Sequence, residues 1–226
     1  MSWSPKRTLE ETDAILCAPG HFHEVETIYL NGRMQKVYKH LWPSVREFWL
    51  SRVEKYSGKT YIIFEDQRHT YGEVHHRAIR VAAVFRHVYG VGKGDRVGIC
   101  SRNCFDYIVS FWAAHLLGAV PVLINAWLPS KPLQFCLLRT DCQVVMLDAE
   151  RADRMAPVVL DMSRGNFLVF DEEVDMRRWP GMKSFPSTID DYRGDITNIL
   201  TTDPQILPED NALIMFTSGM GTLSLC

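Results

Sequence analysis

A short run of hydroxyl and glycine residues near the end of the chain has the composition of a phosphate-binding loop. Thr217, Ser218 and Gly219 follow an apolar run, and Gly221 comes two residues later. A glycine-rich turn after a strand brings backbone N–H groups and hydroxyls to phosphate oxygens without obstruction by side chains. The run is not a Walker loop, because no G-x-x-x-x-G-K-[S/T] occurs in the sequence. Spacing alone leaves two interpretations open, a phosphate loop and an ordinary loop after a strand.

A second glycine-rich segment, from Gly90 to Asp95, lies in a different context. It follows a predicted helix and precedes a predicted strand, whereas dinucleotide-binding glycines follow a strand and open a helix. We therefore expect these glycines to end a helix and form a turn, at positive φ. The histidines and cysteines lack the spacing of a zinc site, and no Gly-x-Ser-x-Gly nucleophile elbow occurs. We assign no catalytic residue and no metal ligand.

Composition indicates a folded intracellular protein. Hydrophobic residues make up 46% of the 226 residues and charged residues 23%, which are ordinary globular values. The net charge of −2 provides no basic face for nucleic acid. The six cysteines form no C-x-x-C pair, so we expect reduced thiols rather than disulfides. The first residues lead into acidic positions instead of an apolar segment, so a secretory signal is not expected.

One uncharged stretch, Tyr107 to Pro129, has the length of a membrane span. Gly118 and Pro121 interrupt its middle, and His115 has no evident membrane role. These breakers favour a helix followed by a buried strand. We therefore predict no transmembrane span.

The elements that must position the loop alternate along the chain. Residues 1–40 form an extension with a predicted hairpin around Asn31-Gly32, and residues 41–226 form the main domain. Helices are predicted near 41–56, 70–88, 103–117, 130–140 and 150–163, with Asn103 as a cap of the third. Strands are predicted near 61–64, 96–100, 119–124, 143–147, 167–170 and 212–216. Residues 171–210 are predicted to be surface connection with one short helix near 188–192.

The strands are apolar without alternation, which is typical of strands buried on both faces. Strands that alternate with helices predict an α/β fold, a parallel sheet flanked by helices. We expect this domain to be incomplete. The strand 212–216 is expected to be buried on both faces, yet only ten residues follow Phe216. That is too few for a covering helix, so we expect exposed apolar surface and self-association.

Taken in order, these segments resemble the AMP-binding, acyl-CoA synthetase-like superfamily of adenylate-forming ligases. Gly90 to Val97 resembles the family's G-V-x-K-G-D-R-V strand entry, and Gly118 to Val122 is similar to its helix–strand unit. The likeness spans roughly residues 40–219 and also includes Thr70 to Glu73, Asn125 to Leu133, and Pro208 to Ala212 before Thr217. Within the superfamily the chain is most similar to fatty-acyl or aryl-acid CoA ligases of fungal type.

The resemblance implies a two-step reaction. A fatty or aryl carboxylate attacks the α-phosphate of ATP to give an acyl-adenylate and pyrophosphate, and coenzyme A then displaces AMP. Mg²⁺, N–H donors and a cation stabilise the crowded phosphate charge in such reactions. By resemblance, Thr217, Ser218, Gly219 and Gly221 contact the nucleotide phosphates.

The sequence departs from the family pattern inside the loop. The family reads roughly [YF]-T-S-G-[ST]-T-G-x-P-K-G, but Met220 stands where a hydroxyl belongs, and residues 222–226 supply neither the proline nor the lysine. Gly221 matches only with a one-residue deletion. We expect an amino-terminal fragment, truncated within the phosphate loop and inactive alone. A frameshift, a mis-spliced junction and an erroneous gene model all fit this pattern.

Two alternatives from other classes stay open. One is a non-catalytic interaction or regulatory protein that binds a full-length ligase. The other is a nucleotide-binding module of flavodoxin-like type. The only suitable loop of that module would stand at the end of the chain, with no helix behind it.

Overall fold

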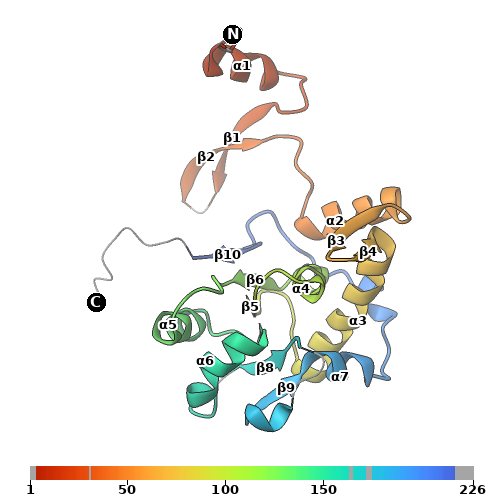
Figure 1. Cartoon of the computed structure of the whole chain (residues 1–226). Coiled ribbons are helices and arrows are strands. Elements are labelled where there is room, and N and C mark those ends of the chain that lie inside the picture. Colours follow the sequence, from red (N-terminus) through yellow and green to blue (C-terminus); the bar gives the residue numbers. More distant parts are fainter. Residues whose placement is uncertain (1–3, 31, 163–164, 172–174, 217–226) are drawn as a thin grey trace. The chain divides into compact units, whose positions relative to one another are not determined.

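The computed structural model describes residues 4–30, 32–162, 165–171 and 175–216. By their internal contacts these residues divide into two compact units. One unit comprises the chain up to Pro43 together with Leu207–Glu209, and the other comprises Ser44–Ile206 and the chain from Asp210 (Figure 1).

The first unit contains a helix and a hairpin. Helix α1 (Leu9–Leu16) begins at a capping box, in which Thr8 and Glu11 satisfy each other's backbone N–H groups. Strands β1 (Val25–Leu30) and β2 (Arg33–Tyr38) pair antiparallel, so the predicted hairpin is present. Residue 31 of its turn lies outside the described residues.

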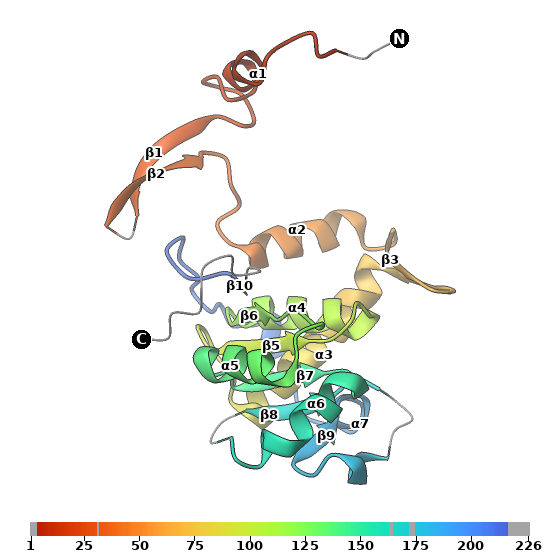
Figure 2. The ribbon, with the colours of Figure 1, turned by 60° about the vertical axis from the view of Figure 1, so that its left-hand side comes forward.

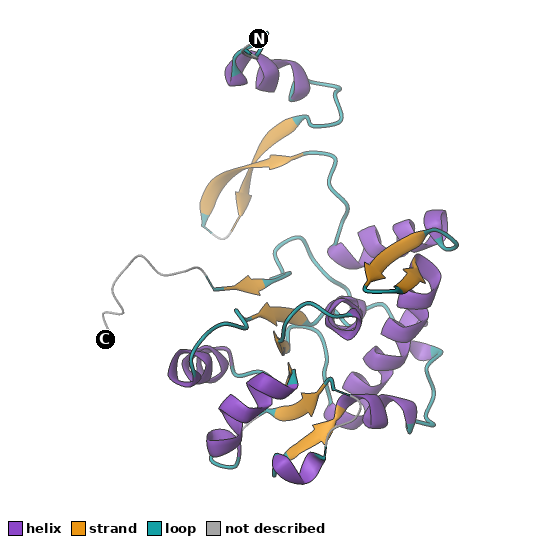
Figure 3. Ribbon diagram, viewed as in Figure 1, coloured by secondary structure: helices purple, strands orange, loops and turns teal. Residues whose placement is uncertain are grey.

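The second unit is built on a six-stranded sheet with the order β10-β6-β5-β7-β8-β9, in which every pair is parallel (Figure 3). Its strands are β5 (Arg96–Cys100), β6 (Val120–Leu123), β7 (Val144–Leu147), β8 (Asn166–Val169), β9 (Met182–Ser184) and β10 (Ile214–Met215). The α/β class predicted from the sequence is confirmed. The order shows that the chain goes from β5 to β6 on one side, crosses back to β7 on the other, and returns to β6 only with β10.

Helices cover both faces of this sheet (Figure 2). One core packs beneath α2 (Val45–Tyr56), α3 (Tyr71–Tyr89) and α4 (Phe105–Leu116), where the rings of Trp49 and Trp112 stack 4.2 Å apart. The other core packs beneath α5 (Ser130–Thr140) and α6 (Ala149–Val159). Val97 and Ile99 of β5 belong to the first core and Cys100 to the second, which explains the unalternating apolar strands.

The strand predicted near 61–64 lies in a separate sheet. Strands β3 (Thr60–Phe64) and β4 (Gln67–Thr70) form an antiparallel hairpin, whose turn places Glu65 at φ 51°. Thr70 then begins α3 through the predicted capping box with Glu73. Gly90 at φ 68° ends that helix and Gly94 has φ 80°, so the predicted helix stop and turn are confirmed.

Several predicted boundaries are wrong. Asn103 does not cap α4, because Cys104 occupies the N-cap position and its side chain makes no capping hydrogen bond. Helix α6 begins at Ala149, one residue early, because Asp148 caps it. The segment 171–210 holds more structure than one short helix. It contains a 3₁₀ turn (Met176–Arg178), β9, α7 (Phe185–Asp190) and α8 (Asn198–Thr201).

Strand β10 is shorter and more exposed than predicted. It covers two residues, and Leu213 and Met215 are 39% and 65% exposed. The prediction that 212–216 is buried on both faces is wrong for the described residues. The reason is that β10 pairs on one side only, with β6, at the edge of the sheet.

The uncharged stretch 107–129 forms most of α4 and all of β6, as predicted. None of the helices in the described part of the chain combines the length and apolarity that a membrane crossing needs.

Candidate functional site

The predicted phosphate-loop residues Thr217, Ser218, Gly219 and Gly221 lie outside the described residues. The structure does describe the strand that leads to them. Ile214 pairs with Val122 and Met215 with Leu123, so β10 runs parallel to β6 and ends at the same edge. Ligands of open α/β sheets bind outside the carboxyl ends of the strands. We therefore expect a ligand site at this edge of the sheet.

The loop that follows β6 is fixed by two arginines of α6. The Ala126 carbonyl accepts hydrogen bonds from Arg151 Nε at 2.6 Å and Arg154 Nη1 at 3.1 Å. Arg154 Nη1 also donates to the Leu128 carbonyl at 2.8 Å. Within the loop, Trp127 N donates to Asn125 Oδ1 at 2.9 Å. This loop and β10 leave the sheet from neighbouring strand ends, so the arginines fix the chain at the carboxyl end of β6, the strand that pairs with β10.

Arg151 is the most unusual side chain at this edge, because it is charged and fully buried. Its Nη1 lies 3.1 Å from Asp148 Oδ2 and 2.9 Å from Glu150 Oε2. Its guanidinium carbon lies 5.2 Å from the ring centroid of Trp127, which is 70% exposed. The guanidinium thus joins the start of α6 to the loop after β6 and supports an exposed indole.

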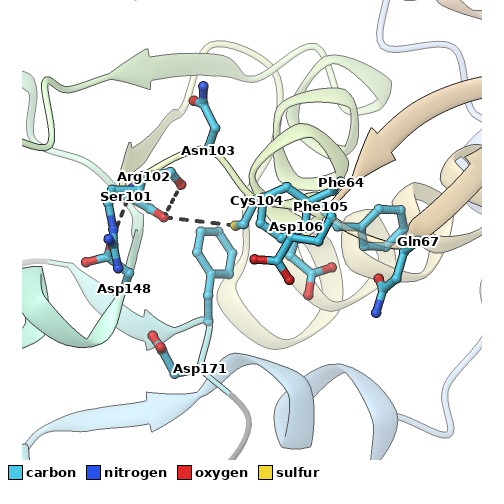
Figure 4. Close-up of a pocket in the computed structure, with 12 residues that line it drawn as sticks. Phe64, Gln67, Ser101, Arg102, Asn103, Cys104, Phe105, Asp106, Asp148 and Asp171 are labelled. Atoms are coloured by element: carbon cyan, nitrogen blue, oxygen red, sulfur yellow. Dashed lines mark hydrogen bonds and ion pairs between the residues drawn. The ribbon is translucent and has the colours of Figure 1, made fainter.

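A cavity of about 520 Å³ opens at the other strand ends of the same edge (Figure 4). It lies where the chain departs from β5 toward one side of the sheet and from β7 toward the other, a topological switch point. In Figure 4, Phe64, Phe105 and Gln67 lie together at one end, and Arg102 lies against Asp148 at the other. The lining comes from three strand ends and the β3–β4 hairpin: Phe64, Glu65, Gln67, Ser101 to Asp106, Asp148, Phe170 and Asp171.

The aspartates of this cavity are engaged by the protein itself. Asp148 accepts from the backbone N–H groups of Arg151 and Arg102, at 3.0 and 2.9 Å. Asp171 Oδ2 accepts from Ala149 N at 2.6 Å, and Asp106 Oδ1 lies 3.6 Å from Arg77 Nε. The described residues contain no group of three or more histidine, cysteine or acidic side chains placed to hold a metal ion. The aspartates therefore organise helix starts at the sheet edge.

The cysteines near this edge are thiols of low reactivity. Burial raises the pKa of Cys100 to about 12, and burial also raises the pKa of the Cys104 thiol at the start of α4. All five cysteines among the described residues are free, and Cys226 lies outside them. A nucleophilic cysteine needs a lowered pKa, so Cys100 and Cys104 do not have that character.

The model of the AMP-binding enzyme family matches residues 50–220. The chain belongs to this family. The match runs from α2 through β10 into the predicted phosphate loop, so the resemblance drawn from sequence motifs is confirmed. A curated relative, the long-chain-fatty-acid–CoA ligase FadD13 of Mycobacterium tuberculosis, is 30% identical over 154 residues, which are 68% of this chain and 28% of that protein.

Solved structures of the family share the fold. The N-terminal domain of FACL13 from Mycobacterium tuberculosis superposes with a TM-score of 0.59 at 23% identity, over 78% of this chain and 42% of that one. The anthranilate CoA ligase AuaEII, solved with anthranoyl-AMP, has a TM-score of 0.60 at 20% identity, over 67% of this chain and 29% of that one. The described sheet is that of the N-terminal domain of acyl-CoA ligases. The chain spans between 13 and 34% of the length of the curated relatives it matches.

Sequence reasoning missed Asp148, Arg151 and Arg154. The arginines stand on an amphipathic helix and have the spacing of an ordinary solvated face. An available signal was Asp148, which precedes an apolar-periodic segment and is a good helix cap. The burial of Arg151 depends on the Ala126 carbonyl, 25 positions earlier, which the sequence alone does not place.

Proposed function

We propose that this chain is the amino-terminal part of an ATP-dependent acid–CoA ligase. The family match that runs into residues 217–220 carries the proposal. The place of β10 supports it, because the segment Thr217 to Gly221 follows a strand at the carboxyl edge of a parallel sheet. A fatty or aryl carboxylic acid is the proposed substrate class, in line with the names of the relatives.

In the proposed reaction, a carboxylate oxygen bonds to the α-phosphorus of ATP as the bond to the pyrophosphate oxygen breaks. The coenzyme A sulfur then bonds to the acyl carbon, AMP leaves, and a thioester forms. Negative charge accumulates on the phosphate oxygens in the first step, so preorganised N–H and hydroxyl donors stabilise it. We propose Thr217, Ser218, Gly219 and Gly221 as such donors. Mg²⁺ would neutralise phosphate charge; among the described residues no group of three or more histidine, cysteine or acidic side chains is placed to hold it.

This chain is proposed to lack ligase activity by itself, because its loop departs from the family pattern at Met220. The lysine of that pattern does not occur in residues 217–226. Each lost charge-assisted contact to phosphate costs about 1.5–3 kcal/mol, and several are lost together. An intracellular setting belongs to the same proposal and is supported by the free thiols of the described residues, of which Cys100, Cys136 and Cys142 are buried.

The test is ATP–pyrophosphate exchange with purified chain, Mg²⁺ and a panel of fatty and aryl acids. We expect background exchange for residues 1–226. The control is a chimera in which the segment after Phe216 is replaced by that of the Mycobacterium FadD13 ligase. Exchange by the chimera supports the proposal, whereas a folded chimera without exchange contradicts it. Exchange by the unaltered chain refutes the proposed inactivity.

A further inference from the structure

The turn after α3 is held by a segment more than a hundred residues away. Lys93 Nζ donates to the Gln205 carbonyl at 2.7 Å, across 112 positions. The same ammonium lies 2.7 Å from Asp210 Oδ2. Gln205 and Asp210 are two points, five residues apart, within the connection that leads from α8 to β10. One lysine therefore holds this connection at two points.

Two glycines, Gly94 and Gly118, allow the connection to lie close against the turn after α3 and the end of α4. Gly94 N donates to the Gly118 carbonyl at 2.9 Å, which joins the turn to the end of α4. Gly118 has φ 68°, and a Cβ there would lie 3.1 Å from Ile206 Cγ1 and 3.2 Å from Pro204 Cβ. The residue must be glycine for the connection to approach so closely. Lys93, Gly94 and Gly118 together form a seat for residues 204–206.

The connection has an unusual backbone at the point where Lys93 holds it. Gln205 has φ 52°, a left-handed conformation that non-glycine residues rarely adopt. Its N–H donates to Asp203 Oδ1 at 2.8 Å, and its carbonyl accepts from Lys93. Conformations of this kind persist where the surroundings over-determine them. The contacts of Gln205 therefore fix the direction in which the chain approaches β10.

We propose that Lys93 is a positioning residue that sets the register of β10 on β6. It anchors Asp210, four residues before Ile214, while the seat fixes residues 204–206. A one-residue slip of a strand moves its side chains to the opposite face of the sheet, so a fixed entry point matters. Through β10, Lys93 sets where the chain passes into Thr217 to Gly221. This last step rests on the ligase function proposed above.

The expected effect is local. Lys93 and Asp210 are each about one-third exposed, at 35 and 33%, and exposed ion pairs add little to global stability. A solvated lysine without a positioning role would leave β10 unchanged when replaced. Replacement of a positioning lysine would loosen β10 and leave the centre of the sheet intact.

The test is hydrogen–deuterium exchange of residues 1–226, read by mass spectrometry. In Lys93→Met we expect peptides over 211–216 to exchange about three to ten times faster, with β5 and β7 unchanged. The matched control is Lys131→Met, because Lys131 is exposed and makes no ion pair or hydrogen bond in the described part of the chain. Equal exchange in the two variants would overturn the proposal.

A charge reversal separates positioning from simple loss of a lysine. Lys93→Asp alone should loosen β10, and the double variant Lys93→Asp/Asp210→Lys should restore most of its protection. A double variant no better protected than the single one contradicts the ion-pair role. In the FadD13 chimera, Lys93→Met should also slow ATP–pyrophosphate exchange. If hydrogen exchange shows that β10 loosens but ATP–pyrophosphate exchange is unaffected, the role of Lys93 in the register of β10 is supported. The proposed link from Lys93 to the loop is then contradicted.

Discussion

His115 carries a buried imidazole on the inner side of its helix. It lies on α4 at 4% exposure, and its Nε2 has no hydrogen-bond partner among the described residues. The Phe111 ring packs edge-on at 4.6 Å between centroids. Burial lowers the pKa of His115 to about 4, and burial likewise lowers the pKa of His75, whose Nδ1 lies 3.1 Å from Trp49 Nε1, to about 4. Both rings are neutral at pH 7.

These histidines predict a loss of stability in mild acid. The unfolded chain takes up their protons near pH 6.5, whereas the folded chain resists until about pH 4. The unfolded state then binds more protons, so the free energy of unfolding falls as the pH drops from about 6.5 to 4. A shift of this size corresponds to at most about 3.4 kcal/mol for each histidine, and to less for the half-buried His75, whose charge water screens. Urea unfolding at pH 7, 6 and 5 measures the slope.

The replacement His115→Leu should remove about half of that slope, because His75 remains. Val88→Ala, a change at a half-exposed position that alters no titratable group, should leave the slope unchanged. An unchanged slope in His115→Leu would show that this histidine does not resist protonation. The carboxylates with lowered pKa, such as Glu73, do not interfere, because their contribution is lost only below pH 4.5.

The residues of the sheet edge were only partly predictable. The apolar run into Thr217 marks a strand and loop because both signals are local in sequence. The seat formed by Lys93 and Gly118 was not predictable, because its occupant, the Gln205 segment, comes about a hundred positions later. The sequence did indicate that the glycines after α3 form a turn, but not what binds to it.

At the scale of elements, the start of α6 depends on one carboxylate. Asp148 accepts from Arg151 N and pairs with the buried Arg151 guanidinium, and it also receives the backbone N–H of Arg102. A single side chain thus caps a helix, neutralises a buried charge and ties the loop after β5 to the helix. Loss of such a group leaves Arg151 with an incompletely compensated charge.

We expect Asp148→Ala to destabilise the chain by about 3 kcal/mol, because the cap and the ion pair are lost together. Asp148→Asn should cost less, since the amide oxygen still accepts from Arg151 N. Asp161→Ala is the control, at an exposed position beyond α6. Urea midpoints of the three variants decide the matter. An effect of Asp148→Ala no larger than the control would contradict the role of this carboxylate.

Elements with strong apolar periodicity were predicted well, and short ones were not. Helix α3 has an apolar stripe and strand β5 has an apolar run. Both patterns are visible in the local sequence without any tertiary contact. Strand β9 has only three residues, and they form a strand because they pair in parallel with β8. Asn103 has good cap chemistry, but the chain places Cys104 in the extended cap position instead.

At the scale of the whole molecule, β10 leaves apolar side chains in water at a sheet edge. Met215 is 65% exposed and Leu213 39% exposed, next to backbone groups that have no strand on their outer side among the described residues. Such edges promote association. We predict that residues 1–226 self-associate at about 100 µM, where exposed edges of this kind aggregate.

The variant Met215→Lys should shift this equilibrium toward monomer, because lysine on an edge strand opposes pairing. Ile63→Lys is the control, with a similarly exposed apolar side chain in the separate β3–β4 hairpin. Sedimentation velocity reports the outcome. An unaltered chain that stays monomeric would favour a self-contained binding module over the fragment interpretation.

The position of β10 also has a consequence for synthesis on the ribosome. Strand β6 ends at Leu123, but its outer partner begins at Ile214, about 90 residues later. At roughly 5–20 residues per second, the β6 edge waits about 5 to 20 seconds for β10 to emerge. By the end of that time β5, β7 and β8 have their parallel partners in the nascent chain. A chaperone that covers a bare strand edge would therefore find its target on β6, in a defined interval of translation.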